Sequence, residues 1–161
     1  MAAQKLGIFP GTFDPFTNGH FEVVKESLRI LDKIQIAIGV NPGKSPWFSP
    51  EERVEMISDT VKGLEVEVVL FSGLVAEYAK KIGATALVRG LRTESDFSYE
   101  MPMAMTNKML AQDITTIFLP TSQASHYLSS SLVREVASHG REVSQFVPAA
   151  VFERIKLKLK T

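Results

Sequence analysis

The sequence of 161 residues contains no cysteine, which excludes disulfides, thiolate-bound metals and a cysteine nucleophile. It also lacks any apolar run near the roughly 20 residues of a membrane-spanning helix, and its N-terminus has no apolar segment of signal-peptide length. We therefore expect a cytoplasmic protein with no membrane partner. Formal net charge is zero, so no overall positive field draws the chain to nucleic acid. A polyanionic ligand must be bound by a local cluster of cations.

Short β-branched and apolar runs alternate with amphipathic patterns along the chain. The runs of strand length are residues 6–9, 34–40, 66–71, 85–88 and 114–119. The helical patterns cover residues 20–32, 49–63, 74–83, 94–112, 129–140 and 148–160. This alternation predicts an α/β fold with a parallel sheet and right-handed crossovers. We expect one domain over residues 1–161, a doubly wound, Rossmann-like, five-stranded parallel sheet with helices on both faces and C-terminal helices.

Local signals predict where several helices begin and end. Ser49 and Glu52 have the spacing of a capping box at the start of the second helix. Gly140 follows the helix that begins near Ser129 and is placed to end it. Pro102 falls inside the helical pattern of residues 94–112, and an interior proline costs about 3 kcal/mol in an unbroken helix. We therefore expect that pattern to kink or to restart near Glu100.

Polar and cationic residues follow the carboxyl ends of the expected strands. In doubly wound sheets, ligands bind beyond these ends, where the strand order reverses. The side chains that should meet there are Thr12, Asp14, His20, Lys44, Arg89, Arg92 and the serines 129–131. Arginine binds phosphate in a bidentate manner, lysine supplies a point charge, and helix N-termini offer free N–H groups. The sequence therefore predicts a site for a ligand with several phosphates.

Two common phosphate-binding motifs do not fit. The pattern G-x-G-x-x-G is absent after the first expected strand, which argues against a nicotinamide or flavin enzyme of the usual type. Residues 39–45, GVNPGKS, are one residue short of a P-loop, and Pro46 follows where a helix should already be running. A P-loop ATPase is therefore rejected.

The segment GTFDPFTNGH, residues 11–20, resembles the signature of the nucleotidyltransferase superfamily, whose general form ends in H-x-G-H. Here Thr17 occupies the position of the first histidine. With this replacement, the sequence is similar to the bacterial phosphopantetheine adenylyltransferases across nearly the whole chain. The other segments that carry the similarity are NPGKSP, LVRGLR, DFSYE, Asn107 and SSSLVREVA. The resemblance implies transfer of AMP from ATP to 4′-phosphopantetheine, which gives dephospho-coenzyme A and pyrophosphate. The transfer would be direct and in line, without a covalent enzyme intermediate.

The resemblance also implies roles for individual residues. Thr12 would orient the attacking phosphate and His20 would contact the α-phosphate; the implied catalytic set is Thr12, His20, Lys44 and Arg92. The implied ATP pocket consists of Thr12, Phe13, His20, Gly90, Leu91, Arg92, Glu100, Ser125, His126, Tyr127, Leu128, Ser129, Ser130 and Ser131. The implied phosphopantetheine contacts are Thr12, Lys44, Val75, Arg89 and Asn107.

Magnesium and self-assembly are further implications of the resemblance. Mg²⁺ is expected to arrive with the triphosphate, and the sequence has no dedicated carboxylate cage for it, so no metal ligand is assigned. A homohexamer is expected from the family, and the residue pattern does not predict it independently.

Three residues depart from the family pattern. Ser125 stands where many relatives have an aromatic residue, His126 is interpreted as a loop substitution without a catalytic role, and Pro102 stands where relatives tend to have glutamine.

Two alternative functions also agree with the first motif or with the fold. A cytidylyltransferase or a nicotinamide-mononucleotide adenylyltransferase would share the first motif but retain its first histidine. A non-catalytic nucleotide-binding or coenzyme A-sensing module could use the same fold. The intact set of Thr12, His20, Lys44 and Arg92 argues against such a loss of catalysis.

Overall fold

Five parallel strands form the central layer of the protein. The computed structural model describes residues 4–40 and 46–160. The strands are β1 (Leu6–Gly11), β2 (Lys33–Gly39), β3 (Val66–Phe71), β4 (Ala86–Leu91) and β5 (Thr115–Pro120). They lie in the order β3-β2-β1-β4-β5, and every neighbouring pair is parallel. The predicted five-stranded, doubly wound parallel sheet is confirmed.

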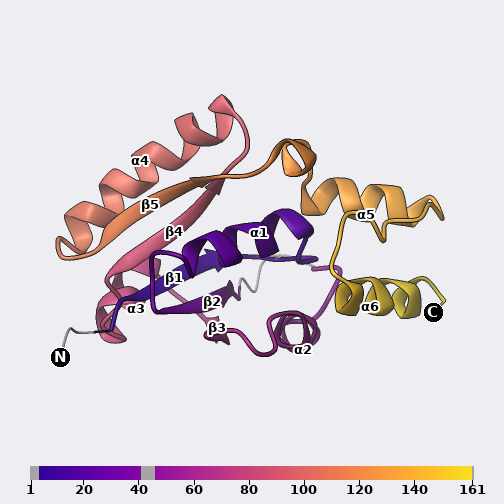
Figure 1. Ribbon diagram of the computed structural model, residues 1–161, viewed down its shortest axis with the longest axis horizontal. Helices are drawn as coiled ribbons and strands as arrows, with labels where there is room; N and C mark the ends of the chain where they lie inside the picture. The colour runs from indigo at the N-terminus through magenta and orange to yellow at the C-terminus, as the bar shows by residue number, and fades with distance from the viewer. Residues whose placement is uncertain (1–3, 41–45, 161) are drawn as a thin grey trace.

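Helices cover both faces of this sheet (Figure 1). One face packs against α1 (Asn18–Ser27), α2 (Pro50–Thr60), α5 (Ser130–Ser138) and α6 (Ala149–Leu159). The other face packs against α3 (Val75–Lys81) and α4 (Glu94–Leu110), and a single 3₁₀ turn (Gln123–Ser125) precedes α5. None of the helices that the structure describes is long and apolar enough to cross a membrane.

Alternate residues of the central strands supply the two hydrophobic cores. In β1, Phe9 joins the core beneath α1 and α2, and its neighbour Ile8 joins the core beneath α3. In β2, Ile36 and Ala37 divide in the same way. Successive side chains of a strand point to opposite faces of the sheet. A parallel sheet covered on both faces therefore needs strands that are apolar throughout.

The strand order reverses between β1 and β4, and this reversal positions the site. The chain runs outward from β1 to β2 and β3, then returns to place β4 on the other side of β1. The loops that leave β1 and β4 consequently diverge, and their crevice opens at the carboxyl ends of the strands. Sequence positions near Thr12 and Arg92 meet at this crevice.

The predicted signals at two helix ends are confirmed. The Ser49 side chain accepts a hydrogen bond from the Glu52 backbone N–H at 3.1 Å, and the Glu52 carboxylate accepts one from the Ser49 N–H at 2.7 Å. Gly140 follows α5 with a φ of +69°, a conformation that favours glycine.

The expected restart of the helix near Glu100 is wrong, because α4 runs continuously from Glu94 to Leu110 (Figure 1). A kink at Pro102 stays a prediction. Pro102 lacks the N–H that would bond to the carbonyl of Ser98. Both residues are exposed, so water can bond to the freed carbonyl and the proline ring crowds no packed neighbour. Solvent exposure therefore lowers the free-energy cost of a proline inside the helix at this position.

Candidate active site

Two cavities open side by side at the carboxyl ends of β1 and β4. The larger has a volume of about 560 Å³ and extends toward α3 and α4, and the smaller has about 280 Å³ and extends toward the N-termini of α1 and α5. The residues that line both are Pro10, Gly11, Thr12, Arg89 and Glu100. A ligand in one cavity and a ligand in the other would thus meet at one shared wall.

His20 lines the smaller cavity from the first turn of α1. The backbone N–H of Thr17 donates to its Nδ1 at 3.0 Å as half of a capping box. Because Nδ1 accepts this bond, the hydrogen of the neutral ring is on Nε2. The rings of Phe9, Phe13 and Phe16 surround the imidazole, with centroids 5.1 to 6.2 Å from its own. These contacts orient a single N–H donor for a ligand in the cavity.

The protonation state of His20 follows from its surroundings. Burial, followed by the positive charges of Arg92 and Arg89, lowers the pKa of His20 to about 4. The imidazole is therefore neutral near pH 7. In that state it can donate a hydrogen bond to an anionic oxygen without adding a charge.

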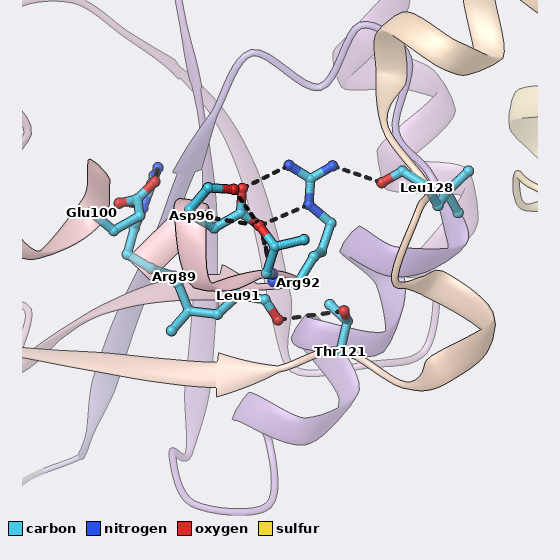
Figure 2. A network of polar contacts seen from close by, with 9 residues as sticks. Arg89, Leu91, Arg92, Asp96, Glu100, Thr121 and Leu128 are labelled. Atoms are coloured by element: carbon cyan, nitrogen blue, oxygen red, sulfur yellow. Dashed lines mark hydrogen bonds and ion pairs between the residues drawn. The ribbon is translucent and has the colours of Figure 1, made fainter. Parts of the chain in front are cut away.

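Arg92 is held by contacts from two other segments (Figure 2). Asp96 accepts from the Nε and Nη2 of Arg92 at 3.0 and 3.1 Å, and from its backbone N–H at 2.9 Å. The Nη1 of Arg92 donates to the Leu128 carbonyl at 2.9 Å. These bonds use three of the five guanidinium N–H groups. The other two stay available to a ligand, because Arg92 lines the smaller cavity.

Asp96 was not among the residues predicted from the sequence. Burial alone would raise its pKa, but the hydrogen bonds and charge of Arg92 outweigh burial and lower the pKa of Asp96. It therefore stays ionised and orients Arg92. The sequence does contain a signal for it, since opposite charges four residues apart at a helix start form a common ion pair.

Arg89 and Glu100 are the charged residues of the shared wall, and their side chains lie together (Figure 2). The Nε and Nη2 of Arg89 bind the two carboxylate oxygens of Glu100 at 2.7 and 2.5 Å. The Nη1 of Arg89 donates to the Pro10 carbonyl at 2.9 Å. One bidentate ion pair thus links β4 to α4 and to the end of β1.

The loop after β1 has a strained backbone. Phe13 has a φ of +51°, in the left-handed region that an aromatic residue rarely adopts. Its ring is buried against the backbone of Gly11, where an added Cβ would lie 2.7 Å from a ring atom. Strain of this kind persists where the surroundings over-determine a conformation, as at functional sites.

Asp14 holds this loop to the residues that precede α2. Its buried carboxylate accepts the backbone N–H groups of Trp47 and Phe48 at 2.7 and 2.9 Å. Its backbone carbonyl accepts a hydrogen bond from the guanidinium of Arg134 on α5. Asp14 therefore joins the loops after β1 and β2 and does not itself line either cavity.

The structure brings together most of the residues expected to contact nucleotide. The smaller cavity is lined by Thr12, Phe13, His20, Gly90, Arg92, Glu100, Leu128, Ser129 and Ser130. The expected residues that line neither cavity, in the part of the chain the structure describes, are Leu91, Ser125, His126, Tyr127 and Ser131. Tyr127 is 82% exposed, Ser125 is buried against Gly19, and Leu91 uses its carbonyl to bind the Thr121 N–H.

The residues expected to contact the acceptor lie around the larger cavity. Its lining includes Thr12, Val75, Arg89 and Asn107. Lys44, the remaining member of the set, lies outside the described residues.

Across residues 4–40 and 46–160, no three His, Cys, Asp or Glu side chains are grouped to hold a metal ion. Asp96 and Glu100, the acids that line the smaller cavity, are each bound to an arginine. A divalent cation here would thus be coordinated chiefly by a ligand's own phosphates.

Comparison with known proteins gives close relatives over nearly the full length. The family model described as Cytidylyltransferase-like matches residues 8–136. A relative named phosphopantetheine adenylyltransferase, from Caldanaerobacter subterraneus subsp. tengcongensis, is 47% identical over 158 residues, covering 98% of this chain and 99% of that protein. A relative of the same name from Rhizobium rhizogenes is 48% identical over 158 residues, covering 94% and 95%.

Solved structures share the fold at much lower identity. A putative nicotinate-nucleotide adenylyltransferase from Vibrio parahaemolyticus has a TM-score of 0.73 at 19% identity, covering 96% of this chain and 99% of that one. A bifunctional NMN adenylyltransferase/ADP ribose pyrophosphatase from Francisella tularensis has a TM-score of 0.74 at 17% identity, covering 99% and 51%. At such identities the likeness concerns the fold alone.

Proposed function

The chain belongs to the phosphopantetheine adenylyltransferase family of Cytidylyltransferase-like proteins, and we propose that it transfers AMP from ATP to 4′-phosphopantetheine. One observation carries the proposal: two cavities meet at a wall formed in part by Thr12, Arg89 and Glu100. ATP would occupy the smaller cavity, and the acceptor would occupy the larger. The attacking phosphate and the α-phosphate would then face each other at the wall.

The reaction needs positioning and charge stabilisation more than covalent chemistry. An oxygen of the acceptor phosphate attacks the α-phosphorus of ATP. The bond from that phosphorus to the bridging oxygen breaks, and pyrophosphate leaves with the electron pair. The attacking phosphate is already an anion, so no general base is required. The products are dephospho-coenzyme A and pyrophosphate.

The residues of the smaller cavity have chemistry suited to the donor. In our proposal, the Nε2–H of His20 donates to a non-bridging oxygen of the α-phosphate, where charge develops during transfer. The two remaining N–H groups of Arg92 bind phosphate oxygens. Ser129 and Ser130, at the N-terminus of α5, present backbone N–H groups to the triphosphate. Thr12 in the shared wall orients the attacking oxygen.

Mg²⁺ belongs to the proposal as a partner of ATP, without a protein residue assigned to it. When bound, it would neutralise charge on the triphosphate. Removal of divalent cations with a chelator should abolish pyrophosphate release, and added Mg²⁺ should restore it. Full activity in excess chelator would contradict this part of the proposal.

The acceptor test decides between the proposed function and its alternatives. Pyrophosphate release from ATP would be measured with 4′-phosphopantetheine, nicotinamide mononucleotide or glycerol 3-phosphate as the acceptor. We expect turnover with the first alone. Turnover with another acceptor would indicate a sibling transferase, and nucleotide binding without turnover would indicate a binding module.

Lys44 is proposed to serve the acceptor phosphate more than ATP. Lys44 belongs to the glycine- and proline-rich sequence NPGKSP, and lysine supplies a point charge in place of the planar fork of arginine. Lys44→Ala should weaken the use of phosphopantetheine and leave ATP binding nearly intact. A large loss of ATP affinity in calorimetry would reverse the assignment.

We also propose that the protein works in the cytoplasm, where ATP is supplied, as a homohexamer. The number of copies comes from the family resemblance, and the surface of α4 supports self-association. This helix buries none of its residues within the described chain, and Tyr99, Met105 and Met109 are 73%, 64% and 81% exposed. Light scattering should give a hexamer mass for the wild type and a smaller mass for Met105→Glu/Met109→Glu. A monomeric wild type would refute the assembly.

A further inference from the structure

Arg53 is a buried cation to which the proposed reaction gives no role. It lies in the first turn of α2, and only 2% of its surface is exposed. It lines the larger cavity together with Thr12 and Arg89. No carboxylate within residues 4–40 and 46–160 forms an ion pair with its guanidinium.

The hydrogen bonds of Arg53 are made to backbone carbonyls. Its Nη1 donates to the Thr12 carbonyl at 2.6 Å, and its Nε donates to the Ser49 carbonyl at 3.3 Å. Thr12 is 41 residues away in the sequence, so this bond ties α2 to the loop that forms the shared wall. Carbonyl dipoles partly replace water around the guanidinium, but they do not neutralise its charge.

An unneutralised charge at this position is costly. Buried charges are normally paired, because desolvation disfavours the ionised form. The first turn of a helix adds to the cost for a cation, since the positive end of the helix dipole lies there. Arg89 and Arg92, by contrast, are each neutralised by a carboxylate. Arg53 therefore supplies positive potential to the larger cavity.

We infer that Arg53 is a positioning residue for the acceptor half of the site, which holds the Thr12 backbone and supplies uncompensated positive charge for the acceptor's phosphate. The inference rests on the proposed function. It assigns the buried cation of α2 to the acceptor and not to ATP, because Arg53 lines the larger cavity and not the smaller one. A charge enclosed by protein acts more strongly than one in water, since the effective dielectric is lower.

The test removes the charge from the protein and from the ligand in turn. Calorimetry would measure the affinities of 4′-phosphopantetheine and of pantetheine, which lacks the phosphate. The comparison uses the wild type, Arg53→Met and Arg53→Lys, with Arg141→Met as the control, because Arg141 is exposed and lines neither cavity. Binding of a non-hydrolysable ATP analogue reports whether each variant retains the smaller cavity.

The wild type should prefer the phosphorylated ligand, and Arg53→Met should reduce that preference on the order of 10-fold with little change for pantetheine. Arg53→Lys retains the charge and should retain the preference. Its shorter side chain releases the Thr12 carbonyl, so kcat should fall at saturating substrates. The ATP analogue should bind each variant within about threefold of the wild type.

Each contrary result has a distinct meaning. A wild type that neither binds nor adenylylates 4′-phosphopantetheine would refute the proposed function. A wild type that does both, with the phosphate preference unchanged in Arg53→Met, would refute the charge assigned to Arg53. If Arg53→Met fails to fold, Arg53→Lys still decides: a lost phosphate preference or an unchanged kcat would overturn the inference.

Discussion

Replacement of His20 by alanine should slow the chemical step far more than it weakens binding. The backbone N–H of Thr17 occupies Nδ1, so the substitution removes one ligand-facing donor, the Nε2–H. With a pKa of about 4, roughly one His20 ring in a thousand is protonated at pH 7. The loss is therefore that of a neutral, preorganised donor, which is worth about 10²- to 10³-fold in kcat, or about 2.7 to 4 kcal/mol.

The assay is steady-state pyrophosphate release with ATP and 4′-phosphopantetheine varied in turn. His20→Ala should lower kcat by this factor with smaller changes in both KM values. His20→Gln places an amide N–H near the position of Nε2 and should recover part of the rate. His139→Ala is the matched control, because His139 is an exposed histidine at the end of α5.

One result would refute this reasoning. If His20→Ala keeps kcat within about threefold and loses only ATP affinity, then His20 binds the ground state and the transition state equally. Its role would then be binding alone. A failure of His20→Gln to exceed His20→Ala would point instead to ring packing against Phe13 and Phe16.

Three further predictions concern the surroundings of the site. Asp96→Asn removes the charge that orients Arg92, so KM for ATP should rise about 10-fold while KM for the acceptor changes little; an unchanged KM for ATP would show that Arg92 needs no such partner. The pKa of His20 is near 6.5 in the unfolded chain and about 4 in the folded one. The unfolded chain therefore binds the proton first on acidification, and urea denaturation should show the free energy of unfolding decreasing on the order of 3 kcal/mol as the pH is lowered from 6.5 to 4. The free energy of unfolding of His20→Gln should change less over this pH range, and an equal change in the variant and the wild type would contradict the assignment of this loss to His20. Pro102→Ala restores an N–H to the Ser98 carbonyl and should raise the free energy of unfolding by about 1 to 3 kcal/mol, and no gain in thermal denaturation would mean that the proline costs α4 nothing.

Much of the fold was predictable because its signals are local. The apolar runs that became β1 to β5 were recognised within three residues at most of their ends, since periodicity and β-branched content act over a few residues. The capping box of Ser49 and Glu52 was likewise readable from adjacent positions. The same local reasoning failed at Pro102, because the exposure of α4 depends on which elements pack against it.

The candidate site likewise has one part that the sequence predicts and another that it does not. The sequence by itself determined which loops follow the strands and placed Thr12, His20 and Arg92 at one edge, because parallel strands all end on the same side of a sheet. Only the tertiary structure decided how the charges further apart in the sequence are paired: Arg89 with Glu100, 11 residues on, and Arg53 with the Thr12 carbonyl 41 residues away. The physical reason is range. Capping and periodicity act between near neighbours in the sequence, whereas the neutralisation of a buried charge depends on whichever groups the fold brings within hydrogen-bond distance.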